Sequence, residues 1–181
     1  MSINIAEQIN TQSSQSKEQI IDQLKLYINN EGFEIAEQDI QKPWGAYFKL
    51  SRNNTDIFIQ NYFDFAQNTL TDLLQFNLDP KFLLVEPQKQ LSWQYHFNRS
   101  EIWTVLAGPV KVITSEDDTE KNGETLQVGQ NIQIDTQERH RLVGLDNWGI
   151  VAEIWVHTNK NKPSVESDIV RVQDDFGRGK L

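Results

Sequence analysis

The chain has 181 residues, of which 38% are hydrophobic and 24% charged, a composition typical of a globular protein with one sizeable core. Its net charge of −9 disfavours binding to phosphate backbones and anionic lipid, so we expect neither a nucleic-acid nor a membrane partner. Cysteine is absent, which excludes disulfides, thiolate metal sites and a cysteine nucleophile and leaves His96, His140 and His157 for any imidazole chemistry. No apolar signal core or membrane-length run is present, so we expect the cytoplasm.

Residues 1–15 are rich in Gln, Asn and Ser and predict a flexible N-terminal segment. Ser16, with Gln19 three residues later, suits a capping box that opens a helix. The apolar residues at helical spacing are Ile20, Ile21, Leu24, Tyr27 and Ile28. We therefore expect residues 16–41 to form an amphipathic helix and a lead-in that cover the main domain, with a partner surface as the alternative.

From Lys42 onward the apolar pattern changes to period two. The candidate strands are residues 46–51, 56–63, 81–87, 91–97, 102–108, 110–115, 124–128, 130–135, 140–145 and 149–157. Short strands at this density predict an all-β sandwich or barrel over residues 42–181. Residues 63–76 carry leucines at helical intervals and predict a short helical insertion. We expect the charged tail to be a surface segment or a short closing helix.

The densest polar pattern lies in residues 88–108. Gln94 and His96 share one face of a strand, and Glu101 begins the next strand after a short turn, so a hairpin brings the three together. A second block starts at Gly129 and presents His140 at the head of a strand.

These two blocks resemble the two motifs of the cupin superfamily, a jelly-roll barrel. More narrowly, the chain is similar to the cupin domain of type II mannose-6-phosphate isomerases. The matching stretches, in the family's order, are KPWGAY (42–47), VEPQKQLSWQYHFNRSEIW (85–103), RHRLVG (139–144) and SDIVRVQDDFGR (167–178). The resemblance implies a cupin (double-stranded β-helix) barrel. We expect it to stand alone rather than to follow a guanylyltransferase domain.

The resemblance also implies one divalent metal ion held by Gln94, His96, Glu101 and His140. Two imidazoles, a carboxylate and an amide oxygen suit Zn²⁺, our first expectation, or Mn²⁺, Fe²⁺ and Ni²⁺. The alternative is that both histidines are ordinary hydrogen-bonded residues at a barrel mouth. For His157 we expect a surface position after the last strand rather than a place in the pocket.

The activity implied is isomerisation of mannose 6-phosphate to fructose 6-phosphate, which needs a base and cations for the phosphate. We expect Glu153 as the base, although a rim carboxylate in a salt bridge is an equal alternative. Arg99 and Arg141 are the candidates for the phosphate, despite a strand parity that places Arg141 opposite His140. The expected substrate-binding residues are Lys42, Trp44, Asn98 and Arg171. The alternatives are that Trp44 is a core aromatic and that Arg171 pins the tail by a salt bridge.

Some positions depart from the family pattern. Phe97, Asn98 and Ile102 stand where the family usually has histidine, and Trp155 stands where it has an acidic residue. These departures support binding more firmly than turnover. A cupin that only binds a sugar or sugar phosphate is therefore the second hypothesis, and another cupin activity, such as a dioxygenase or an epimerase, is the third. A homodimer is expected by analogy alone.

Overall fold

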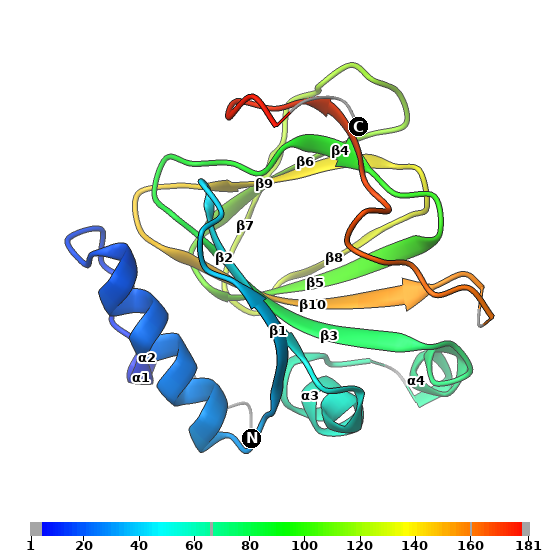
Figure 1. The fold of residues 1–181 in the computed structure, drawn as a ribbon, viewed down its shortest axis with the longest axis horizontal. Coiled ribbons are helices and arrows are strands. Elements are labelled where there is room, and N and C mark those ends of the chain that lie inside the picture. The colour runs from blue at the N-terminus through cyan, green and yellow to red at the C-terminus, as the bar shows by residue number, and fades with distance from the viewer. Residues whose placement is uncertain (1–4, 66, 160, 179–181) are drawn as a thin grey trace.

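The computed structural model describes residues 5–65, 67–159 and 161–178, which form a barrel of two antiparallel sheets that face each other (Figure 1). One sheet has the strand order β1-β2-β3-β10-β5-β8 and the other β11-β4-β9-β6-β7. The strands are β1 (Ile35–Asp39), β2 (Gly45–Leu50), β3 (Leu78–Val85), β4 (Trp93–Tyr95), β5 (Arg99–Ala107), β6 (Val110–Ser115), β7 (Glu124–Leu126), β8 (Asn131–Ile134), β9 (Arg139–Gly144), β10 (Gly149–His157) and β11 (Val170–Gln173). The predicted all-β class is confirmed.

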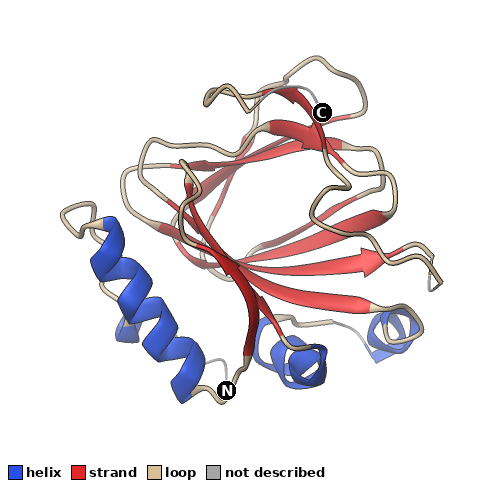
Figure 2. Cartoon of the chain, viewed as in Figure 1, coloured by secondary structure: helices blue, strands red, loops and turns tan. Residues whose placement is uncertain are grey.

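The helices lie on the outer side of the six-stranded sheet (Figure 2). They are α1 (Ile5–Gln8), α2 (Lys17–Asn30), the 3-10 helix η1 (Arg52–Asn54), α3 (Thr55–Tyr62) and α4 (Gln67–Leu73). Among the described residues, none of these helices has the length and apolar character that crossing a membrane requires.

Helix α2 begins as the sequence predicts. The Gln19 main-chain N–H donates to the Ser16 hydroxyl, and the Ser16 N–H donates to the Gln19 side chain, so the capping box is present. The predicted apolar stripe is buried against the sheet. Ile5 and Ile9, in the segment expected to be flexible, are also buried in this core, whereas residues 1–4 lie outside the described ranges.

Residues 56–63 were predicted to be a strand, and that prediction is wrong because they form most of α3. Phe58, Ile59 and Tyr62 fall on one helical face and are buried, and the rings of Phe58 and Tyr62 lie 5.1 and 5.4 Å from that of Phe82. Aromatic packing on the sheet thus overrides the strand propensity of these residues. The helical insertion expected over 63–76 is present as α4.

Two further strands were not expected. Residues 35–39 form β1, so the six-stranded sheet begins inside the lead-in to the barrel. In the tail, β11 pairs with β4, and Arg171 lies opposite Gln94. The closing helix is therefore a wrong prediction.

Strand register divides the barrel interior into levels, because directly paired residues point to the same face. From the apolar end towards the mouth, the inward residues of β3, β5 and β10 are Leu83, Val105 and Val151, then Lys81, Trp103 and Glu153, then Asp79, Glu101 and Trp155. One end of the barrel is therefore an apolar core, and the other is lined by charged groups.

The charged end is crossed by residues 161–169, which we call the strap. After β10 the chain leaves the six-stranded sheet, climbs along the right-hand side of the barrel in Figure 1 and joins the other sheet as β11. The strap therefore connects the two sheets where the interior is polar.

Candidate metal centre

Three of the four predicted metal ligands converge inside the barrel. His96 follows β4, Glu101 lies on β5 and His140 on β9, and one donor atom of each lies within 4.8 Å of the others. The Nε2 atoms of His96 and His140 are 3.2 and 3.4 Å from the two carboxylate oxygens of Glu101. All three side chains are buried. The predicted hairpin is wrong, because β4 belongs to the five-stranded sheet and β5 to the six-stranded sheet. The turn after His96 crosses from one sheet to the other, and this crossing brings the side chains together inside the barrel.

Both imidazoles are oriented as metal ligands require. The Nδ1 atoms of His96 and His140 lie 2.5 and 2.8 Å from the main-chain oxygens of Asp168 and Glu138. Because a carbonyl only accepts, each Nδ1 carries the proton and each Nε2 turns a lone pair towards Glu101. Nε2 of His140 is buried and has no hydrogen-bond partner among the described residues.

The charge states also suit a cation. Burial lowers the pKa of His96 to about 3, so the ring is neutral at pH 7. Burial alone would raise the pKa of Glu101, but the charge of the neighbouring Arg99 guanidinium helps to hold it well below its usual range. Two imidazoles and a carboxylate are an N/O donor set for a divalent transition metal, so the residues present fit the metal that the family pattern implies.

The fourth predicted ligand, Gln94, lies beside the cluster in a different orientation. Its Oε1 accepts a hydrogen bond from Ser92 Oγ at 2.6 Å, and its Nε2 faces His96 Nε2 at 3.5 Å. The side-chain amide of Gln94 would have to flip before its Oε1 could face a metal.

Arg99 reaches into the same donor set. Its Nε donates to Glu101 at 2.8 Å, its Nη2 donates to His96 Nε2 at 3.1 Å, and its guanidinium lies 3.5 Å from the Trp155 ring centroid. The Arg99 side chain is buried. Since a neutral imidazole nitrogen has a single lone pair, this contact and metal ligation by His96 exclude each other.

The predicted base, Glu153, lies one level deeper. Its Oε1 accepts from Trp103 Nε1 at 3.0 Å, and its Oε2 is 3.9 Å from the ammonium of Lys81. Burial and the nearby charge of Glu101 raise its pKa well above the usual range.

Lys81 was missed in the sequence, because its strand was predicted to begin there. The strand begins at Leu78, and the parity of its residues places Asp79 and Lys81 on the interior face with Leu83. The Lys81 ammonium lies 3.7 and 4.4 Å from the ring centroids of Trp155 and Tyr47. It also pairs with Glu166 of the strap.

Glu101, Glu153 and Lys81 line a cavity of about 100 Å³, whereas His96 and His140 are not among its described lining residues. Of the predicted site residues outside the donor set, Lys42, Trp44, Arg99, Glu153 and Arg171 also line it. Nε of Arg171 is buried without a hydrogen-bond partner among the described residues. The strap and the segment after it, through Glu166, Ile169, Arg171 and Arg178, form one wall.

Outside the predicted donor set, two predicted site residues do not line this cavity. Arg141 points away from it and pairs with Glu120 at 3.1 Å, as strand parity indicated. Asn98 is held through its main chain, with its N–H donating to Asp168 and its carbonyl accepting from Thr158.

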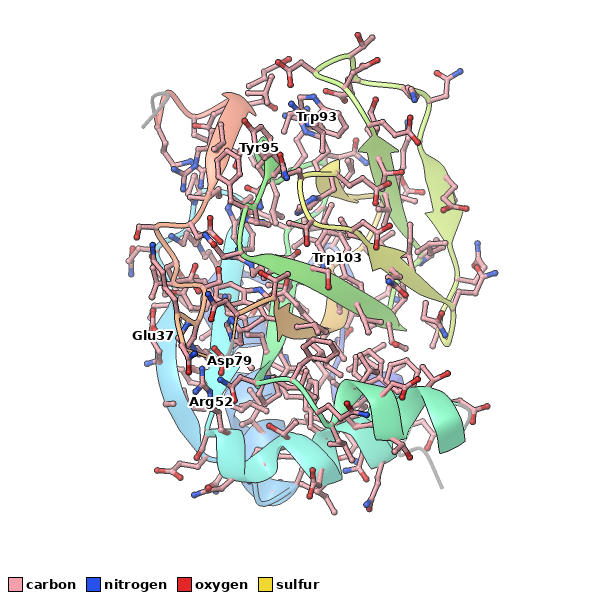
Figure 3. The ribbon with its side chains drawn as sticks, turned by 90° about the vertical axis from the view of Figure 1, so that its right-hand side faces the viewer. Glu37, Arg52, Asp79, Trp93, Tyr95 and Trp103 are labelled. Atoms are coloured by element: carbon pink, nitrogen blue, oxygen red, sulfur yellow. The ribbon has the colours of Figure 1, made fainter. Side chains whose placement is uncertain are left out.

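The surface position expected for His157 is wrong, because its side chain is fully buried. Its Nε2 lies 3.0 Å from the Asp79 carboxylate, and its Nδ1 accepts the Ser164 main-chain N–H at 2.9 Å. Lys49 and Arg52 also pair with Asp79, and Figure 3 shows Arg52 and Asp79 beside each other. This cluster fastens the strap to the six-stranded sheet.

The residues that stand where the family usually has histidine do not belong to the donor set of His96, Glu101 and His140. The Phe97 side chain is half exposed, and Ile102 packs in the core between the sheet and the helices.

A larger cavity of about 580 Å³ lies outside the barrel, between α3 and β5, but Asp64 is the one carboxyl among its described lining residues. Convergent donors and cations therefore mark the smaller cavity as the candidate site.

Solved structures define the class of protein. Oxalate decarboxylase from Bacillus subtilis matches 79% of this chain with a TM-score of 0.55 and 10% identity, over 31% of its own chain. Vicilin from hazelnut (Corylus avellana) matches 72% with a TM-score of 0.50 and 14% identity, over 33% of its chain. At these identities the likeness concerns the fold, which is the cupin barrel.

The family model described as mannose-6-phosphate isomerase C-terminal matches residues 68–174, more than half of the chain, which therefore belongs to this family. Mannose-1-phosphate guanylyltransferase of Salmonella montevideo is 25% identical over 171 residues, 93% of this chain and 29% of the relative. The Escherichia coli (strain K12) protein of that name is 24% identical over 164 residues, 91% of this chain and 28% of the relative. The chain thus spans less than a third of the length of these relatives.

Proposed function

We propose that the chain is a metal-dependent isomerase that interconverts mannose 6-phosphate and fructose 6-phosphate. The observation that carries the proposal is the ligand-ready group of His96, Glu101 and His140, whose Glu101 lines the same cavity as the buried Glu153. A divalent metal held by these three residues, most simply Zn²⁺, would polarise the carbonyl and hydroxyl oxygens of the sugar. We place the protein in the cytoplasm, as the sequence suggests.

Glu153 is the proposed proton carrier. Aldose–ketose isomerisation moves one proton from C2 to C1 of an aldose and one between the two oxygens, through an enediol. A carboxyl whose pKa is raised is a stronger base once it is ionised than an ordinary carboxylate. Trp103 Nε1 fixes one oxygen of Glu153, and Lys81 lies beside the other, so the group is held in one orientation.

The phosphate would bind at the rim. Lys42 and Arg171 line the cavity, and Nε of Arg171 is buried without a partner among the described residues, so it offers a donor to an anion. Trp44 supplies an aromatic face suited to a sugar ring. This arrangement favours a phosphorylated sugar over a neutral one.

Entry of such a substrate requires the strap to move. The cavity of about 100 Å³ is smaller than the ~300 Å³ at which pockets for such ligands begin. Glu166 reaches Lys81 across the mouth, so breaking this ion pair would be one step of opening. A chain that binds a sugar phosphate without converting it is the second proposal, favoured by Arg99 occupying the lone pair of His96.

A coupled assay of mannose 6-phosphate conversion, with Zn²⁺ or Mn²⁺ added to metal-depleted protein, tests the proposal. We expect metal-dependent turnover that Glu153→Gln lowers by about 100-fold or more, the range given by loss of a general base. The matched control is Glu120→Gln, a carboxyl outside the cavity, which should leave turnover unchanged. Binding of mannose 6-phosphate without conversion would select the second proposal, and neither binding nor conversion would overturn both.

A further inference from the structure

The strap holds the turn that carries His96. The Asp168 carboxylate accepts the main-chain N–H groups of Phe97 and Asn98 at 3.1 and 2.9 Å, and the Ser164 hydroxyl at 2.7 Å. One side chain, 70 residues away in sequence, thus fixes the backbone between the candidate metal ligands His96 and Glu101. Asp168 is the first residue of the DIVR sequence in the tail. Of these four residues, the proposed reaction uses Arg171.

The main chain of the same residue contacts His96 directly. The Asp168 carbonyl accepts the Nδ1 proton of His96 at 2.5 Å and also an N–H of Arg99 at 3.2 Å. Fixing the proton on Nδ1 leaves Nε2 as the donor atom that faces Glu101.

The two imidazoles are supported differently. His140 is oriented by the carbonyl of Glu138, two residues earlier in the chain. His96 is oriented by a residue 72 positions later, so its support can be removed while the ligand itself stays unchanged.

The strap itself is anchored at its other end. The Ser164 N–H donates to His157 Nδ1, the Ser164 hydroxyl accepts from Arg99 at 2.8 Å, and His157 Nε2 donates to the buried Asp79. A continuous series of hydrogen bonds therefore runs from the six-stranded sheet through the strap to His96.

We propose that Asp168 is a positioning residue, which sets the orientation and tautomer of the ligand His96 by holding the strap against the 96–99 turn. The inference rests on the metal centre of the proposed function. It assigns to the C-terminal segment a role in metal affinity that is separate from substrate binding.

The test is metal affinity, measured by calorimetry with Zn²⁺ and by the visible absorption of bound Co²⁺, in the full chain. Asp168→Ala should weaken binding by about 10- to 100-fold, the range typical of residues that orient a ligand, and shift the Co²⁺ bands. Asp168→Asn keeps an acceptor oxygen and should recover most of the affinity. Asp118→Ala, which removes a surface carboxylate bound to Arg139, should match the wild type.

Thermal melting checks that Asp168→Ala is folded. If the folded variant keeps the wild-type Zn²⁺ affinity and the wild-type Co²⁺ spectrum, the inference is overturned. If the wild type binds no metal, the metal centre of the proposed function fails, and the ¹⁵N shifts of the His96 ring in metal-free protein decide the inference. Wild type should then show a single tautomer protonated at Nδ1 and Asp168→Ala a mixture. A single unchanged tautomer in the variant would contradict the positioning role.

Discussion

The three histidines are equally buried, yet two regions of the molecule use them in different ways. In the barrel centre, His96 and His140 donate through Nδ1 to main-chain carbonyls and turn Nε2 towards Glu101. At the end of β10, His157 uses both ring nitrogens, one towards Asp79 and one towards the strap.

The difference shows that burial does not identify a ligand histidine. Exposed fractions of 2, 1 and 0% for His96, His140 and His157 do not separate the two uses. What separates them is whether the second nitrogen keeps a lone pair that faces a carboxylate. The first region is therefore suited to bind a cation, whereas the second joins the strap to the sheet.

The largest effect should come from exchanging one histidine of each region for glutamine. His140→Gln removes a ligand whose Nε2 faces Glu101, and we expect metal affinity to fall by more than about 100-fold, beyond the range for orienting residues. His157→Gln keeps an acceptor and a donor, and it should change affinity by less than about tenfold. Both affinities can be measured by Zn²⁺ calorimetry. Equal losses in the two variants would break the distinction between the regions.

A smaller effect is expected at Asp79, on stability. Its carboxylate is fully buried with Lys49, Arg52 and His157 around it, and Asp79→Asn should lower the free energy of unfolding at pH 7 by about 2 kcal/mol. The estimate is modest because the Lys49 and Arg52 side chains are partly exposed and can turn to solvent. Urea unfolding of the wild type and of Asp79→Asn measures this difference in the free energy of unfolding.

The same pair of proteins gives a pH test. Burial alone would raise the pKa of Asp79, but hydrogen bonds from His157, Arg52 and Lys49 outweigh it and hold the pKa well below the usual range. A lowered pKa means that the stabilisation is complete above the ordinary carboxyl pKa of about 3.9 and declines as the pH falls below it. The stability gap should therefore be constant from pH 7 to 5 and shrink towards pH 3. A constant gap down to pH 3 would contradict the assignment.

Much of the barrel could be predicted from the sequence, because period-two alternation shows which residues face inward. The same alternation places Gln94 and His96 on one face and Glu101 after a short turn, which made the donor set visible although the turn joins two sheets rather than a hairpin. Helix α3 could not be predicted this way. Its β-branched and aromatic residues favour a strand, and only their packing on Phe82 makes them helical.

The residues that support the site were hidden for a related reason. Asp168 and Ser164 act through contacts with residues some 70 positions earlier, and sequence spacing carries no sign of such a pairing. His157 was expected at the surface because it ends a strand, and it is buried because the strap folds back over it. Local patterns thus predict donor atoms, whereas their orientation depends on distant chain segments.

The smallest predicted effect concerns Arg99, which lies where the two regions meet. It donates to His96 Nε2 and Glu101 on one side and to Ser164 on the other, so it is a cation that the chain itself supplies to the metal site. Metal ligation by His96 must break the first of these hydrogen bonds. A charge-assisted hydrogen bond is worth about 1.5 kcal/mol or more, which corresponds to about tenfold in a binding constant.

Arg99→Gln should therefore tighten Zn²⁺ binding by about tenfold, even though its loss should impair turnover. Arg139→Gln is the matched control, since Arg139 pairs with Asp118 outside the cavity and should leave affinity unchanged. Unchanged affinity in Arg99→Gln would mean that metal and guanidinium share the site, and the lone pair of His96 would then not be the point of competition.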